Sequence, residues 1–127
     1  MSAKEVSTSG APAAIGPYSQ GVQIGRMLFC SGQLGLDPVN ATLVSDDVGK
    51  QADRCLRNLS AVLASAGFAM TDVVKTTVFL TEIGNFEAVN RAYSAHFASH
   101  RPARSTVAVK ALPRGALVEI EAIASKE

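Results

Sequence analysis

A single apolar stripe along residues 48–66 constrains the fold of this chain more than any other feature of the sequence. Apolar residues recur there at helical spacing, at Val48, Ala52, Cys55, Leu56, Leu59, Val62, Leu63 and Ala66. The Ser-Asp-Asp run at 45–47 suits the positive end of a helix, and Gly67 supplies a stop signal. Because only one side of this predicted helix is apolar, we expect it to cover a sheet.

The remaining periodic segments predict a second helix and five strands. Phe86 to Phe97 repeats the helical spacing, and Pro102 marks the end of that region. Apolar or β-branched runs bounded by turn residues predict strands at 21–24, 27–32, 73–80, 105–111 and 116–124. The predicted order is therefore ββαβαββ, an α+β fold with both helices packed on one face of the sheet.

Length, charge and cysteine content exclude several classes of protein. The 127 residues fit one domain, which we assign to 1–127, with the small and polar segment 1–14 as a loosely held N-terminal arm. A net charge of +1 gives no field that favours nucleic acid or an anionic membrane. Cys30 and Cys55 lie in no metal-ligand or redox spacing. With no signal segment and no membrane-spanning run, we expect a cytoplasmic protein.

The two predicted strands nearest the C-terminus carry two opposite charges, Arg104 and Glu119. If these strands pair as a hairpin, strand alternation places both side chains on the side away from the helices. That side is also half apolar, so we expect another subunit to cover it. A simple salt bridge between Arg104 and Glu119 is the alternative reading of the same pattern.

Several blocks of residues, in order along the chain, resemble one known family. They are Ala13 to Gly21, Ser31-Gly32-Gln33, Val74 to Phe79, Val89-Asn90-x-x-Tyr93, Pro102 to Ser105, Val107-x-Val109, Leu112-Pro113 and Val118 to Ala124. Together they resemble the signature of the RidA family, also called the YjgF family, over nearly the whole chain after about residue 10.

This resemblance implies a fold, an assembly and a reaction. The fold would be chorismate-mutase-like with a mixed sheet, assembled as a homotrimer with sites between subunits. The reaction would be hydrolytic deamination of reactive 2-enamine and 2-imine acids, such as 2-aminoacrylate and 2-aminocrotonate, to 2-keto acids and ammonia. Pyridoxal-phosphate-dependent dehydratases release such compounds. The resemblance implies neither a cofactor nor a metal.

The resemblance also assigns roles to individual residues. Arg104 would bind the substrate carboxylate, because its planar fork matches a carboxylate, and Glu119 would position the attacking water. The residues implied to bind substrate are Tyr18, Ser31, Gly32, Asn90, Tyr93 and Thr106. Tyr18 would come from the neighbouring subunit. Many members have Cys where this chain has Thr106, so a thiol at that position is not required here.

Two other functions remain alternatives to imine deamination. Arg101, Arg104, Lys110 and Arg114 form a basic cluster, and an endoribonuclease or translation inhibitor of the L-PSP type ranks second. A non-catalytic binder of keto acids is third. His96 and His100 have a metal-compatible spacing, but no third ligand accompanies them, so we expect no metal site. The sequence leaves the preferred imine side chain and the partner dehydratase open.

Overall fold

The part of the chain that the structure describes contains six strands, which form one mixed sheet in the order β1-β2-β3-β6-β4-β5. The structure, a computed structural model, describes residues 2–127, and Met1 of the predicted N-terminal arm lies outside them. Only β4 and β5 pair in parallel, and every other pair of neighbours is antiparallel. The strands are β1 (Lys4–Val6), β2 (Gly21–Ile24), β3 (Met27–Leu34), β4 (Val73–Leu80), β5 (Ala103–Ala108) and β6 (Val118–Ser125).

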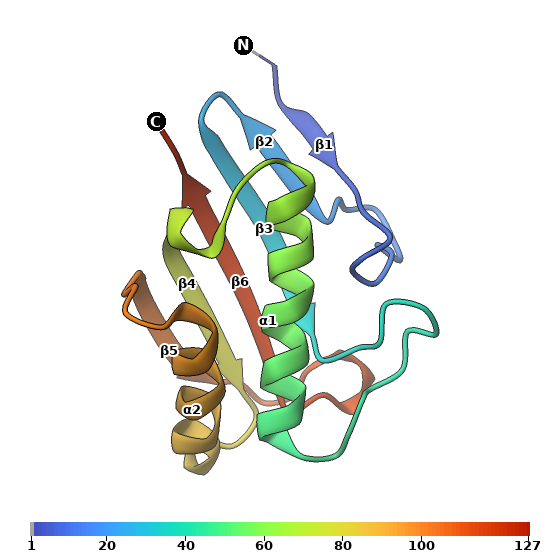
Figure 1. Ribbon diagram of the computed structural model, residues 1–127. Coiled ribbons are helices and arrows are strands. Elements are labelled where there is room, and N and C mark those ends of the chain that lie inside the picture. The colour runs from blue at the N-terminus through green and yellow to red at the C-terminus, as the bar shows by residue number, and fades with distance from the viewer. Residues whose placement is uncertain (1) are drawn as a thin grey trace.

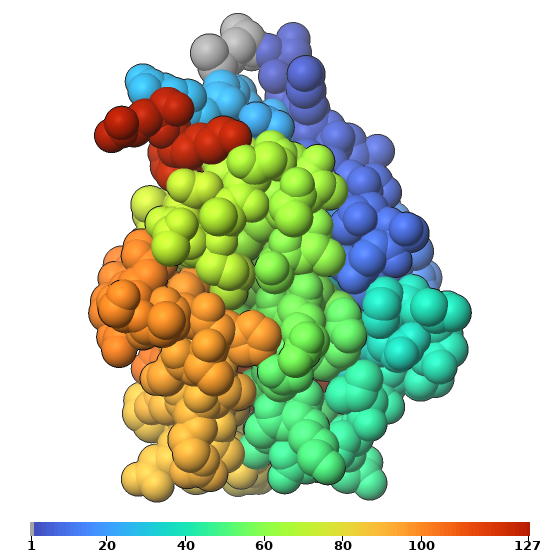
Figure 2. Space-filling view, in the orientation of Figure 1, coloured from blue at the N-terminus to red at the C-terminus, as the bar shows by residue number. Residues whose placement is uncertain are grey.

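Two helices, α1 (Val48–Ser65) and α2 (Phe86–Phe97), cover one face of this sheet (Figure 1). They hide most of the sheet when the molecule is viewed from their side (Figure 2). Asp47 caps α1, where its carboxylate accepts a hydrogen bond from the Lys50 amide at 2.9 Å. The predicted apolar stripe of α1 is buried against β3 and β6. The prediction of two helices on one face of a mixed sheet is confirmed.

The predicted hairpin of the two C-terminal strands is wrong. β5 lies at the edge of the sheet beside β4, and β6 inserts between β3 and β4. The physical reason is the apolar face of β6, whose Val118, Ile120 and Ala124 are fully buried and need the central position beneath α1. The more exposed β5 takes the edge.

This order of strands separates the two predicted catalytic charges. Arg104 pairs with Thr76, a fully buried residue on the helix side of β4, so its side chain lies on the helix face. Glu119 pairs with Phe79, which lies between the buried Val78 and Leu80 and therefore faces the other way. The expectation that Arg104 and Glu119 share the uncovered side is thus wrong for a single chain.

The N-terminal segment is more ordered than a loosely held arm. Residues 4–6 form β1, which pairs with β2 along the sheet edge and makes the observed order βββαβαββ. Gln20 fixes the segment that follows: its buried carboxamide accepts a hydrogen bond from the Thr8 amide at 2.7 Å and donates to the carbonyls of Ala11 and Pro12. The composition of residues 1–14 does not indicate these hydrogen bonds, because they are made by the side chain of Gln20, which lies later in the chain.

We predict that Gln20→Ala loosens residues 4–12 while the core stays folded. The carboxamide satisfies several backbone groups at once, so its loss is expected to cost about 1–3 kcal/mol of local stability. Amide hydrogen exchange should be faster in residues 4–12 of the variant. Gln23→Ala is the matched control, since the Gln23 carboxamide only reaches the carbonyl of Gly25 in its own turn. Equal exchange rates in the two variants would contradict this role of Gln20.

Candidate functional site

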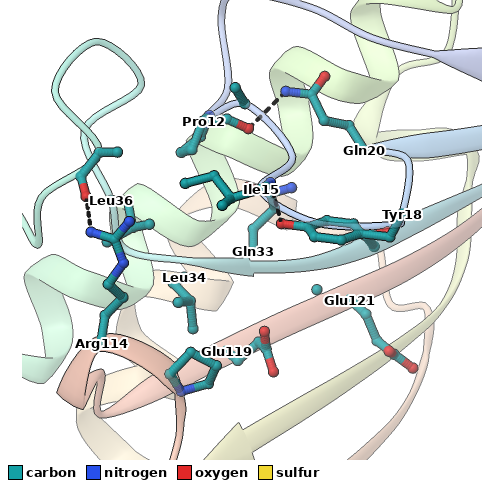
Figure 3. A pocket seen from close by; sticks show the side chains of 15 residues that line it. Pro12, Ile15, Tyr18, Gln20, Gln33, Leu34, Leu36, Arg114, Glu119 and Glu121 are labelled. Atoms are coloured by element: carbon teal, nitrogen blue, oxygen red, sulfur yellow. Dashed lines mark hydrogen bonds between the residues drawn. The ribbon is translucent and has the colours of Figure 1, made fainter.

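All of the predicted site residues except Thr106 line one of two separate cavities. The larger, of about 600 Å³, includes Tyr18, Ser31, Gly32 and Glu119 in its wall. Figure 3 looks into it: Glu119 points into the cavity from β6, and Tyr18 lies above Glu119 in this view. The smaller cavity, of about 300 Å³, is lined by Asn90, Tyr93, Ser94, Arg101, Pro102 and Arg104. One chain therefore carries the two predicted catalytic charges in two different places.

Glu119 lies against the backbone of Gly32. An ideal Cβ placed on Gly32 would come within 2.9 Å of the Glu119 carboxylate, so a larger residue at position 32 would force this carboxylate to move. Gly32 belongs to a β-bulge between Cys30 and Gln33, which adds a residue to β3 opposite β6. Burial, and secondly the negative charge of Glu121, raise the pKa of the Glu119 carboxyl above its ordinary value.

Ser31 is held by the turn that precedes β2. Its amide donates to the Gln20 carbonyl at 2.9 Å, and its hydroxyl donates to the Ser19 carbonyl at 2.5 Å. Because the hydroxyl proton is used in that bond, the Ser31 oxygen is left to accept a hydrogen bond from a ligand. Tyr18 is 53 % exposed, and its ring lies along the cavity (Figure 3).

Arg104 is oriented by three side chains of α2. Its Nη1 donates to Asn90 Oδ1 at 2.9 Å, and its guanidinium carbon lies 4.7 Å from the ring centre of Tyr93 and 5.5 Å from that of Phe86. Side-chain ion pairs within residues 2–127 join Asp53 to Arg57 and to His96 and leave Arg104 without a carboxylate partner. The Arg104 charge is thus available to an anionic ligand.

Thr106 lies outside both cavities of the single chain, and Phe86 contacts Arg104 without having been among the predicted site residues. Thr106 faces the helix side of β5, opposite Val78, and lines neither cavity. Phe86 contacts Arg104 but was not predicted to do so. The helical spacing of the sequence indicates this contact, because residues 86, 90 and 93 lie on one face of a helix and can contact the same neighbouring side chain.

The remaining polar candidates have structural partners. His96 Nε2 lies 2.7 Å from Asp53 Oδ1, and His100 Nε2 lies 2.7 Å from the Val73 carbonyl oxygen, so the two imidazoles have different partners. Among residues 2–127, no group of three or more His, Cys, Asp or Glu side chains is arranged to hold a metal ion. Burial raises the pKa of the Cys30 thiol to about 12, which keeps this cysteine protonated and inert.

The three arginines of the predicted basic cluster are divided between the two cavities, and Lys110 lines neither. Arg101 lines the smaller cavity with Arg104 and donates to the carbonyls of Ala98 and His100. Arg114 lines the larger cavity and donates to the Ala41 carbonyl at 2.8 Å. These residues do not form one continuous basic surface. None of the helices in the described part of the chain has the length and apolarity needed to cross a membrane.

Comparisons with known proteins agree on one family. The sequence model of the family described as endoribonuclease L-PSP matches residues 8–126. The chain is 50% identical to a 2-iminobutanoate/2-iminopropanoate deaminase of Mus musculus, over 95% of this chain and 90% of that protein. It resembles the crystal structure of a putative endoribonuclease from Thermotoga maritima with a TM-score of 0.95 and 52% identity, over 98% of both chains. A Rid-family protein of unknown function from Yersinia pestis also matches with a TM-score of 0.95, at 46% identity, over 98% of this chain and all of that one.

We predict that Glu121→Gln lowers the pKa of Glu119. Removing a neighbouring negative charge favours the ionised form of Glu119, while burial, the larger cause, still keeps the pKa above its ordinary value. A carboxyl-detected NMR titration of selectively labelled protein measures this shift. Glu87→Gln, on the exposed surface of α2, is the control and should leave the Glu119 titration unchanged. An unchanged or higher Glu119 pKa in Glu121→Gln would contradict the electrostatic account.

Proposed function

This chain belongs to the endoribonuclease L-PSP family, which includes Rid proteins, and we propose that it hydrolyses reactive 2-imino and 2-enamine acids to 2-keto acids and ammonia. The names of several relatives at about 50% identity over most of the chain support this reaction. The observation in this chain that carries the proposal is the Arg104 guanidinium, which is held in one orientation by α2 and has no carboxylate partner among the described residues.

Arg104 is suited to bind the substrate carboxylate. A guanidinium has five N–H donors in a fixed plane, and Asn90 accepts a hydrogen bond from one nitrogen of Arg104. The edge formed by Nε and Nη2 therefore remains able to bind a carboxylate with two parallel hydrogen bonds. The stacking of the guanidinium on Tyr93 fixes the plane of that edge. A 2-imino acid has its reactive carbon next to this carboxylate, so binding the carboxylate also positions the carbon.

Glu119 is suited to transfer the protons of the hydrolysis. In the proposed mechanism, Glu119 accepts a proton from water as the water oxygen bonds to the imine carbon and the C=N π electrons move to nitrogen. Glu119 gives this proton to the nitrogen, which completes a carbinolamine. Glu119 then accepts the hydroxyl proton of the carbinolamine and gives it to the same nitrogen as the C–N bond breaks and the C–O bond becomes a C=O bond, so that ammonia leaves and Glu119 is ionised again. A raised pKa suits this role, because it brings the carboxyl nearer to the working pH. Ser31 would accept a hydrogen bond from the imine N–H.

The two halves of this proposed site require two copies of the chain. Arg104 and Glu119 point from opposite faces of one sheet, so one substrate reaches both only where two subunits meet. The sheet face opposite the helices carries exposed apolar side chains, among them Phe29 and Val107, each 42% exposed. We propose that this face is covered in a homotrimer, in which the Glu119 cavity of one subunit meets Arg104 of the next. Tyr18 lines the Glu119 cavity and would then lie across the interface from that Arg104.

We propose that Asn90 and Tyr93 act through Arg104 and that Gly32 acts by leaving room for Glu119. We propose that Thr106, two residues after Arg104 on β5, contacts the substrate beside Arg104. The proposed location is the cytoplasm, and the proposed source of substrate is the class of pyridoxal-phosphate-dependent dehydratases.

RNA cleavage is the second candidate because of the family description, but the division of the basic residues between two cavities does not favour it.

We predict that the protein accelerates the decay of 2-aminoacrylate generated in place by a serine dehydratase. Arg104→Ala should lose most of this activity, because the substrate carboxylate loses its partner. Glu119→Gln should lower kcat by roughly 10²–10⁴-fold, the usual contribution of a positioned acid–base group. Arg91→Ala, which removes an exposed arginine of α2, is the matched control. No acceleration by the wild type, or full activity of Arg104→Ala, would refute the proposal.

A further inference from the structure

A buried hydroxyl pair lies beneath the Arg104 side chain. Thr76 is fully buried in β4, on the face of the sheet that α2 covers. Its Oγ1 lies 2.7 Å from the hydroxyl oxygen of Tyr93, and the two groups share one hydrogen bond. Tyr93 belongs to the hydrophobic core of the protein, which also contains the buried Val78 of β4 and Val89 of α2. A buried hydroxyl without a partner destabilises a protein, so this bond strongly favours one position of the Tyr93 ring.

The Tyr93 ring in turn supports Arg104. The guanidinium carbon lies 4.7 Å from the centre of that ring, and Tyr93 is itself only 7% exposed. Tyr93 also packs against Phe97, with ring centres 4.6 Å apart. Because the hydroxyl of Tyr93 is used by Thr76, the surface that Tyr93 offers to Arg104 is the face of its ring. The orientation of that face therefore depends on a bond made inside the core.

We propose that Thr76 is a positioning residue for the carboxylate-binding guanidinium, acting through the ring of Tyr93. This inference rests on the proposed function only in taking Arg104 as the group that binds the substrate carboxylate. A guanidinium binds a carboxylate with two hydrogen bonds only when its plane is aligned with that of the carboxylate. Orienting the guanidinium before the ligand arrives therefore reduces the entropy lost on binding. Thr76 contributes this order without touching the substrate.

Other contacts of Arg104 do not replace the one through Tyr93. The hydrogen bond to Asn90 fixes the position of one nitrogen of the Arg104 guanidinium but allows the guanidinium to rotate about that bond. The guanidinium carbon of Arg104 lies 5.5 Å from the ring centre of Phe86, which is farther than its distance from the ring centre of Tyr93. Phe86 is also 37% exposed, so its ring is less rigidly held than that of Tyr93. Tyr93 is thus the best fixed of the three supports, and Thr76 is the partner of its only polar atom outside the backbone.

The experiment compares Thr76→Val with Thr76→Ser. Valine keeps the shape of the side chain but removes the hydroxyl, whereas serine keeps the hydroxyl. Two readouts are used: the affinity for pyruvate, a simple 2-keto carboxylate, measured by calorimetry, and the ¹⁵N order parameter of the Arg104 Nε–H. The matched control is Ser65→Ala, which removes a hydroxyl bonded to the Val62 carbonyl at 2.8 Å in α1, outside both cavities.

We expect Thr76→Val to weaken pyruvate binding roughly three- to tenfold, the effect of losing about one hydrogen bond or one guanidinium–ring contact. The order parameter of the Arg104 Nε–H should fall in the same variant. Thr76→Ser should restore both readouts, and Ser65→Ala should change neither. Tyr93→Phe removes the same hydrogen bond from the other side and supplies the test if Thr76→Val does not fold.

Two results separate the failure of this inference from the failure of the proposed function. An unchanged Arg104 order parameter and unchanged pyruvate affinity in Thr76→Val would overturn the inference and leave the proposed function standing. Wild-type affinity for pyruvate in Arg104→Ala would instead show that Arg104 does not bind the carboxylate. That outcome would overturn the proposed site, and the inference with it.

Discussion

The burial of one face of β6 is the constraint on which the rest of the structure depends. Val118, Ile120 and Ala124 alternate along this strand and are fully buried beneath the helices, which places β6 at the centre of the sheet. Side chains of a strand alternate between faces, so the same burial directs Glu119 to the uncovered side. β5 is then left with the edge beside β4, where Arg104 faces α2. Hydrophobic packing of one strand thus decides where both charges lie.

This separation links the chemistry to assembly. The proposed reaction uses the half-buried Glu119 carboxyl, whose pKa is raised, and the oriented Arg104 guanidinium, which has no carboxylate partner among residues 2–127. One chain does not bring these two groups to a common point. Under the proposed function, the subunit interface is part of the site. Such an arrangement also makes activity depend on oligomerisation, because an isolated subunit would hold only half of each site.

The sequence predicted local structure well and strand partners poorly. The stripe at 48–66 specified α1 to within a residue, since helical spacing is a local property. The turn residues 112–115 indicated a hairpin, but β5 and β6 lie on opposite sides of β4. The local sequence contains no signal that specifies which strands pair. Which face Arg104 occupies depends on its partner strand, so the side could not be predicted. Thr76 was missed because a buried threonine in a β-branched strand looks like its neighbours.

The central claim is that each site takes Arg104 from one subunit and Glu119 from another, and subunit complementation tests it most directly. Arg104→Ala and Glu119→Ala are each assayed alone for 2-aminoacrylate decay, then unfolded, mixed in equal amounts and refolded together. Two inactive parents should then regain about one quarter of wild-type activity, the share of sites that pair an intact Arg104 with an intact Glu119 when subunits mix at random in a closed ring. Mixed assemblies that stay as inactive as their parents would contradict the shared site.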